Sequence, residues 1–478
     1  MVAEHHIAGP AKGTGLFLYL NLFPDGSRRA VRGHNLTVQG INANAPLGLL
    51  YLAAVAHRRG YDADLLDQQV EAFDAATVVE RIRRERTRFV GLYCCHYDPL
   101  IAKVAAYVRR IKSETDAAVI VGGPSFDPLP VLQAGADAVC LGEGEATFAE
   151  FLDHLEGQLP LDRVRGIAYL PGGQVHQTAP MPLVEDLDAL PFPWRKYVDR
   201  YFITGNPNCR RPMLELVGSR GCPMRCSFCG SPGFWGRSWR LRSPGNLLDE
   251  ARELIDRHGA RYLHFRDDLF GADPRWLDRF LDLYEAIPNR PNWSCYLHPA
   301  SFGERRESYL RRLAASGLNM VVYGLQSTDA GILQGIHRRA EEPAMLAEQL
   351  RLARRLGILT FVGIIFGLPG ETRETMRATE RWVKKHRPDI LTIMPLGLLR
   401  NSEFGERYQS TDEVTPLPPA LINREIRRVT RSFYAHPRHL PRLLWYVLRK
   451  NPGWLRQALP RLRYGLQFFQ FSRRDTNW

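Results

Sequence analysis

GCPMRCSFCG, at residues 221–230, holds three of the eight cysteines of the chain. Three residues separate Cys222 from Cys226 and two separate Cys226 from Cys229, on a glycine-flanked loop after an apolar, strand-like run at residues 214–218. Three thiolates on one loop can hold a four-iron, four-sulfur cluster and leave its fourth iron without a protein ligand. The amine and carboxylate of an amino acid can chelate that iron. A zinc site is the alternative, but tetrahedral zinc needs a fourth ligand, and no His or Cys lies close enough in sequence to complete an obvious finger.

Strand and helix patterns alternate after this loop. Ser243 suits a helix N-cap, Pro244 suits the first turn, and Gly259 marks the far end of that helix. Six strands separated by helices predict a parallel (β/α)6 barrel, partial or complete. The six strand-like runs are expected at residues 214–218, 262–265, 293–296, 320–325, 360–366 and 390–395.

With an aromatic residue before its last cysteine, the CxxxCxxC loop resembles that of the radical S-adenosylmethionine (SAM) superfamily. Supporting motifs follow in the order of that family: FRDDLF at 265–270, YGLQS at 323–327 and GIIFGLPGET at 363–372. The resemblance covers about residues 214–404. Relatives usually carry Glu at the position of Gln326. The resemblance implies cluster ligation by Cys222, Cys226 and Cys229, and SAM binding by Phe228, Gly230, Asp267, Asp268, Gln326, Gly363 and Gly367.

The first part of the chain also alternates strand and helix patterns. Apolar runs occur at residues 16–22, 89–95, 117–121 and 138–141, and residues 62–66 lead into a helical pattern that runs to about Arg84. From Pro99, apolar residues recur at intervals of three and four, which is typical of a helix. This alternation predicts an α/β, doubly wound, Rossmann-like domain, whose ligands bind beyond the carboxyl ends of its strands, where the glycine turns fall.

This part resembles the cobalamin-binding domain that precedes one large branch of the radical SAM superfamily. The matching pieces are PLGLLYLAA at 46–54, VGGP at 121–124 and LGEGE at 141–145. An ordinary nucleotide-type fold whose turns merely need glycine is the alternative. The resemblance implies cobalamin contacts from Gly122, Gly123, Gly142, Glu143, Gly144 and Glu145, because glycine lets a large corrin approach the backbone.

Cobalamin is expected to bind without a histidine ligand. The DxHxxG signature that supplies a histidine to cobalt in domains of the methionine-synthase type is absent. His96 follows a strand-like run, where a core histidine is a more frequent role than a cobalt ligand. The five cysteines outside the loop stand mostly among apolar neighbours and are expected to pack as small core residues: Cys94, Cys95, Cys140, Cys209 and Cys295.

A chain of 478 residues exceeds one ordinary core. Four prolines at residues 180–194 indicate a linker. The expected divisions are a cobalamin-binding domain at 1–185, a linker at 186–206, a barrel at 207–404 and a basic helical region at 405–478. No apolar run has the length of a membrane span, and residues 1–13 lack the pattern of a signal peptide, so the expected location is the cytoplasm.

Most of the net charge of +13 lies in the tail, where residues 421–478 hold thirteen basic and two acidic residues. The remainder is nearly neutral, so no nucleic-acid partner is expected. Aromatic and basic runs at 443–450 and 462–469 could lie on an anionic membrane as peripheral helices, dock an acidic electron donor or cap the barrel.

Together, the resemblances imply an enzyme that binds a 4Fe-4S cluster, SAM and cobalamin, and that receives electrons from a reductant such as flavodoxin or ferredoxin. They imply reductive cleavage of SAM to a 5′-deoxyadenosyl radical, followed by methyl transfer from methylcobalamin to an unactivated carbon of a small molecule. A cyclase or rearrangement enzyme without methyl transfer is the alternative. An RNA-modifying enzyme and a noncatalytic cobalamin sensor are more distant ones.

Overall fold

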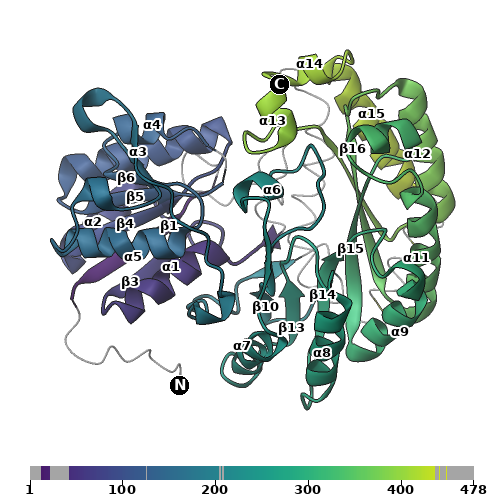
Figure 1. The fold of residues 1–478 in the computed structure, drawn as a ribbon, viewed down its shortest axis with the longest axis horizontal. Coiled ribbons are helices and arrows are strands. Elements are labelled where there is room, and N and C mark those ends of the chain that lie inside the picture. The colour runs from purple at the N-terminus through teal and green to yellow at the C-terminus, as the bar shows by residue number, and fades with distance from the viewer. Residues whose placement is uncertain are drawn as a thin grey trace. The chain divides into compact units, whose positions relative to one another are not determined.

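The computed structural model describes residues 12–21, 42–124, 126–203, 206, 209–436, 441 and 448. The described chain forms two compact units, each built around its own sheet (Figure 1). The first unit holds residues 12–21, 43–124, 126–201 and 234–236, and the second holds the others. The run at 462–469 and, apart from Leu448, the run at 443–450 lie outside the described residues.

The first unit is a doubly wound sheet, as predicted. Its strand order is β3-β1-β4-β5-β6-β7-β8, and the first five strands in that order are parallel. The chain winds from β1 to β3 in one direction and from β4 onward in the other, so the order reverses between β1 and β4. The strands are β1 (Thr14–Tyr19), β3 (Asp62–Asp67), β4 (Thr87–Tyr93), β5 (Ala118–Gly122), β6 (Ala138–Cys140), β7 (Ile167–Tyr169) and β8 (His176–Gln177).

Helices cover both faces of this sheet. One core cluster includes buried side chains of α2, α3 and α4, and the other includes those of α1 and α5. After β3, the helix begins only at Ala75, where the Asp74 side chain accepts a hydrogen bond from the Thr77 backbone N–H as an N-cap. The helices are α1 (Leu47–Arg58), α2 (Ala75–Glu85), α3 (Asp98–Glu114), α4 (Leu129–Gln133) and α5 (Gly144–Leu155).

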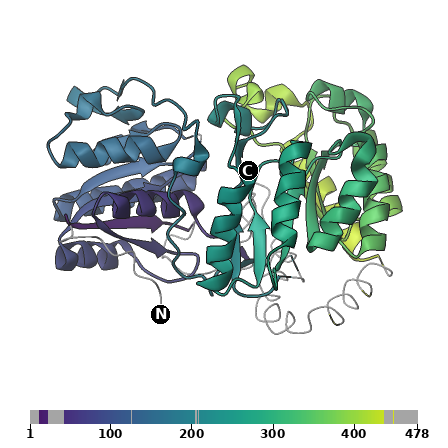
Figure 2. The same cartoon turned by 60° about the horizontal axis from the view of Figure 1, so that its bottom comes forward.

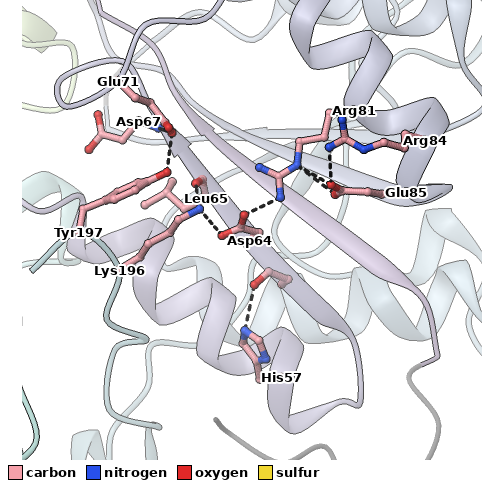
Figure 3. Close-up of polar contacts among 11 residues, drawn as sticks. His57, Asp64, Leu65, Asp67, Glu71, Arg81, Arg84, Glu85, Lys196 and Tyr197 are labelled. Carbon is pink, nitrogen blue, oxygen red and sulfur yellow. Dashed lines mark hydrogen bonds and ion pairs between the residues drawn. The ribbon is translucent and has the colours of Figure 1, made fainter. Parts of the chain in front are cut away.

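The proline-rich segment expected to be a linker at 186–206 is divided between the units, with residues up to Tyr201 in the first. Figure 3 shows why this part is held in place. Lys196 Nζ donates to Asp64 Oδ1 at 2.5 Å and to the Leu65 carbonyl at 2.8 Å, and Tyr197 Oη donates to Glu71 Oε1 at 2.7 Å. Between these prolines, regular structure is limited to a short 3-10 helix at Leu187–Ala189, and side chains that follow the prolines bind β3 and the turn after it.

Asp67 ends β3 and is fully buried beneath this segment, where it accepts a hydrogen bond from Tyr201 Oη at 2.9 Å. Burial raises the pKa of Asp67 from 3.8 to about 7, against the hydrogen bonds from Gln69 and Tyr201. Between about pH 4 and pH 7 the folded chain therefore binds more protons than the unfolded chain, so the contribution of Asp67 to stability falls as the pH rises. Each unit of pKa difference corresponds to roughly 1.4 kcal/mol.

We expect Asp67→Asn to remove the titrating carboxyl group. The free energy of unfolding should then depend less on pH between about pH 4 and pH 7. Urea unfolding of the full chain at several pH values measures the slope. Asp62→Asn, at an exposed position of the same strand, is the control and should keep the wild-type slope. An Asp67→Asn profile parallel to the wild type would contradict the prediction.

The second unit contains all six predicted strands, parallel and in sequence order: β10-β13-β14-β15-β16-β17. No pairing between β10 and β17 closes the sheet in the described chain, so the barrel is partial. The strands are β10 (Met213–Leu216), β13 (Tyr262–Phe265), β14 (Asn292–Leu297), β15 (Leu318–Gln326), β16 (Leu359–Phe366) and β17 (Ile390–Pro395).

Helices line the outer face of this curved sheet (Figures 1 and 2). Helix α7 begins after Ser243, whose hydroxyl accepts from the Asn246 backbone N–H, as the sequence predicts. The longer helices are α7 (Pro244–Asp256), α8 (Pro274–Glu285), α9 (Arg306–Ser316), α11 (Glu342–Leu356), α12 (Arg373–His386) and α15 (Pro419–Tyr434). Shorter elements are β2 (Asn42–Ala43), β9 (Phe202–Ile203), β11 (Ser219–Gly221), α6 (Ser231–Phe234), β12 (Trp239–Leu241), α10 (Ala330–Gly335), α13 (Glu403–Arg407) and α14 (Thr411–Val414).

The two faces of the sheet differ in chemistry. Phe265 of β13 and Trp293 of β14 both make ring contacts with Phe280 of α8, so they point outward to the helices. Because side chains alternate along a strand, His264 and Ser294 point to the inner face. Glu215 of β10 stands beside His264 in the parallel register and shares that face.

Candidate functional site

The cysteine loop leaves the barrel beyond β10 and is flanked by the antiparallel pair β11 and β12. The thiols of Cys222, Cys226 and Cys229 are partly buried. Burial raises the pKa of Cys222 to about 12, that of Cys229 to about 11, and that of Cys226 as well. A metal removes this penalty because it takes the place of the thiol proton.

The donor set fits an iron–sulfur cluster. The charge on each of Cys226 and Cys229 adds to the raised pKa of Cys222, so the three thiols lie within electrostatic reach of one another. Among the described residues, the three thiols do not form a group that could hold a single metal ion. A cluster does not require that, because each thiolate binds a separate iron.

Contacts with distant segments hold the loop in place. The Ser227 backbone N–H donates to the Ile336 carbonyl at 3.4 Å, and the Ser227 carbonyl accepts from the Phe404 N–H at 3.0 Å. Asn401 Nδ2 donates to the Gly230 carbonyl at 2.7 Å. Phe228 packs against an apolar cluster that includes Phe404. The predicted SAM residues Phe228 and Gly230 therefore also anchor the loop to the end of the barrel.

Arg338 is a residue of this site that the sequence analysis missed. Its side chain is 3% exposed, and its guanidinium donates to the Gly324 carbonyl at 2.6 Å and to Glu342 Oε2 from Nε at 2.7 Å. Burial raises the pKa of Cys226, and the Arg338 charge and its hydrogen bond to the thiol oppose that rise. A lone Arg-Arg pair after a short helix gives no sign of this role, because it usually marks a solvated surface.

Asp267 braces the strand that leads to the loop. Its Oδ2 accepts from the Gly218 backbone N–H at 3.0 Å and its Oδ1 from Ser219 Oγ at 2.5 Å. Burial raises its pKa to about 6, against these hydrogen bonds. Asp268 is exposed and accepts from Ser231 Oγ at the end of the loop. Both aspartates thus lie next to the loop, and SAM binding by them stays a prediction.

Where β15 and β16 meet, the inner face is open at Gly363, while the Gln326 amide lies over Gly324. Gly324 and Gly363 are paired in the parallel register, and a Cβ added at Gly363 would meet no side chain within 4 Å. Gln326 follows a register shift and has φ +69°, a strained conformation that is concentrated at functional sites. Gly367, with φ +92°, follows β16, and an added Cβ there would lie 3.0 Å from Ile422 Cδ1. Of these predicted SAM residues, Gly363 leaves the most open backbone.

The predicted cobalamin residues lie at the carboxyl ends of β5 and β6 in the first unit. Near this edge, at the ends of β1 and β4, Tyr19 and Tyr93 stack with ring centroids 5.0 Å apart. Glu143 is buried and its Oε2 accepts from the Val184 backbone N–H at 2.7 Å, so it holds the proline-rich segment. Glu145 is buried in the first turn of α5, whose dipole favours an acid. A Cβ added at Gly122 would lie 3.3 Å from Cys140 Cβ, and one at Gly144 would lie 3.2 Å from Leu52 Cδ2.

His96 is exposed, which corrects the expectation that it is a core residue. Strand β4 ends at Tyr93, so His96 lies beyond the last sheet pairing and before α3. The cysteine expectation is confirmed for Cys94, Cys140, Cys209 and Cys295, which are buried, while Cys95 is only partly buried.

The two glycines with positive φ at this edge should respond differently to substitution. A Cβ at Gly123 would lie 1.9 Å from the Cys94 carbonyl oxygen, whereas one at Gly142 would meet nothing within 4 Å. We expect Gly123→Ala to destabilise the fold, and Gly142→Trp to leave the chain folded with only the cost of its φ of +90°. Gly142→Trp should nevertheless weaken cobalamin binding, because the side chain fills the open edge.

Urea unfolding and equilibrium titration with hydroxocobalamin measure the two effects. Gly157→Trp is the control, because that glycine also has positive φ and open surroundings but lies after α5, at the other edge of the sheet. Normal cobalamin affinity in Gly142→Trp would contradict the predicted contact.

A cysteine loop at the carboxyl edge of a parallel partial barrel, together with a doubly wound domain, defines an enzyme class that begins radical chemistry from SAM. Family models agree: the radical SAM superfamily matches residues 216–383, and the B12 binding domain matches residues 42–152. The chain belongs to the cobalamin-binding radical SAM family.

Individual proteins resemble most of the chain. An uncharacterized methyltransferase of Pyrococcus horikoshii is 28% identical over 83% of this chain and 89% of its own length. An anaerobic magnesium-protoporphyrin IX monomethyl ester cyclase of Rubrivivax gelatinosus is 27% identical over 81% of this chain and 73% of its own. The fold matches that of the radical SAM methyltransferase TsrM of Kitasatospora setae, solved with cobalamin and a 4Fe-4S cluster. The TM-score is 0.66 at 21% identity, and the match covers 82% of this chain and 74% of that one.

No helix within the described ranges combines the length and the apolarity needed to cross a bilayer.

Proposed function

We propose that this chain is a cobalamin-dependent radical SAM methyltransferase that methylates an unactivated carbon of a small molecule. The observation that carries the proposal is the presence, on one chain, of the cysteine loop and of a B12-binding domain whose glycine edge is open at Gly142. The relatives named methyltransferases support it. When bound, the cluster, SAM and cobalamin supply an electron, a carbon-centred radical and a transferable methyl group.

The residues of this chain place and shield those groups. Cys222, Cys226 and Cys229 would hold the cluster, and Phe228 and Asn401 keep their loop against the barrel end. Gly363 leaves the backbone of the inner face open, which lets a ligand approach it closely. Arg338 places a buried positive charge beside Cys226. We further propose a cytoplasmic location and reduction by a flavodoxin or a ferredoxin.

Turnover products test the reaction type. Methylation needs SAM both as methyl donor and as radical source, so S-adenosylhomocysteine and 5′-deoxyadenosine should form in about equal amounts. Mass spectrometry of the product after turnover with methyl-labelled SAM should show one labelled methyl group. The genes beside the coding sequence indicate which candidate substrates to supply.

A cyclase or rearrangement enzyme is the second candidate, supported by the magnesium-protoporphyrin cyclase relative. It would yield 5′-deoxyadenosine without matching S-adenosylhomocysteine, and its product would gain no label. That outcome would contradict methyl transfer and leave the radical SAM assignment standing.

A further inference from the structure

The inner face of the barrel carries a polar cluster on its first three strands. Its members are Glu215 of β10, His264 of β13 with Arg266 just beyond it, and Ser294 and Tyr296 of β14. We call these five residues the inner polar cluster. Glu215 pairs with His264 and His264 with Ser294 in the parallel register, so the three form a row across the sheet. Arg266 and Tyr296 lie two residues further along, toward the carboxyl ends of the strands.

The lower row of the cluster, formed by Glu215, His264 and Ser294, is buried. Glu215, His264 and Ser294 are 1%, 3% and 1% exposed. His264 Nδ1 lies 2.7 Å from Ser294 Oγ. Burial, with a smaller contribution from the Arg266 charge, lowers the pKa of His264 to about 3, so its imidazole is neutral. Within the cluster, Glu215 is the carboxyl group that lies beside Arg266.

Arg266 forms the accessible row of the cluster together with Tyr296. Its side chain is 36% exposed, and its Nε lies 3.6 Å from Glu215 Oε1. Its Nη1 lies 3.5 Å from Tyr296 Oη. Glu215 thus lies on the Nε side of the guanidinium, and the Tyr296 hydroxyl lies on its Nη1 side. A planar guanidinium held in this way matches the two oxygens of a carboxylate or a phosphate.

The inner positions of the neighbouring strands are uncharged. On β15 and β16 they include Val322, Gly324, Phe361 and Gly363, all partly exposed. Among the described inner positions of β13 to β16, Arg266 is therefore the exposed charged group, and the surface on β15 and β16 is apolar apart from the Gln326 amide. This combination suits a molecule with an apolar body and one anionic group.

We propose that Arg266, oriented by Glu215 and Tyr296, binds an anionic group of the substrate, a carboxylate or a phosphate. The inference rests on the proposed function, since it names the substrate class of the same barrel. It assigns a specificity role to a residue that lies between the strand β13 and the aspartate pair Asp267 and Asp268.

Ligand-observed NMR titration of the full chain, with cluster and cobalamin reconstituted and SAM saturating, tests the site with phenylacetate and its neutral counterpart phenylacetamide. We expect wild type to bind phenylacetate about tenfold more tightly than phenylacetamide, because only the anion forms charge-assisted hydrogen bonds with Arg266. Arg266→Gln should remove this preference, and Tyr296→Phe should reduce it. Arg275→Gln, at an exposed arginine of α8, is the matched control and should keep it.

Equal affinities in wild type, or an unchanged preference in Arg266→Gln, would overturn the inference. The affinity of wild type for phenylacetate should differ by no more than about twofold between samples with and without SAM. Displacement of phenylacetate by SAM would mean that the group bound is the carboxylate of SAM, and the substrate site would be wrong. An assay of wild type for 5′-deoxyadenosine release in the absence of substrate separates the two proposals. If wild type releases 5′-deoxyadenosine but shows no preference for the anion, only this inference is wrong. If it releases none, the proposed function is wrong.

Discussion

Alanine at Cys222, Cys226 or Cys229 should abolish reductive cleavage of SAM and lower the bound iron from about four atoms per chain. Each of the three thiolates would bind a separate iron, so a loop with only two of these cysteines lacks one ligand for the cluster. Anaerobic reconstitution followed by iron and sulfide analysis, the broad absorbance near about 400 nm, and chromatography of 5′-deoxyadenosine measure the loss.

Cys295→Ala is the matched control for these variants. Cys295 is a fully buried cysteine of β14 outside the loop, and its loss should leave the iron content unchanged. Full SAM cleavage by the triple variant at 222, 226 and 229 would show that the cluster assignment is wrong.

The buried ion pair of Arg338 and Glu342 should make the fold strongly sensitive to the loss of either partner. The side chains are 3% and 0% exposed, so either single change to methionine leaves an uncompensated buried charge. We expect Arg338→Met or Glu342→Met to lower the apparent free energy of unfolding by about 3–5 kcal/mol. The double variant should recover much of that loss, because two methionines bury no charge.

Urea unfolding of the four members of this double-mutant cycle measures the coupling. Arg311 and Glu307 form the control pair, with the same spacing of four residues on α9 but side chains 55% and 64% exposed. Their coupling should be at most about 0.5 kcal/mol. Single variants at 338 and 342 as stable as the wild type would contradict the account of the buried pair.

Local patterns predicted the class of both units. The apolar runs correspond to strands of both sheets, because burial between two layers imposes a continuous apolar run on a parallel strand. The helical periodicities between these runs correspond to helices. Ser243 and Pro244 begin α7 as expected, since capping depends on residues within one turn. The proline-rich segment was harder to interpret: prolines exclude regular structure, but the anchoring by Lys196, Tyr197 and Tyr201 depends on β3, far away in sequence.

The cysteine spacing by itself was enough to predict the cluster-binding loop, because the three candidate donors lie within eight residues and the prediction needs no distant partner. The glycine turns likewise marked the edge of the first sheet. Only the tertiary structure brought Arg338 beside Cys226, Asn401 to the Gly230 carbonyl, and Glu215 under Arg266. Each of these contacts joins residues that are far apart in the sequence. Which side chains meet there depends on how the sheet, its helices and its loops pack, which no local pattern records.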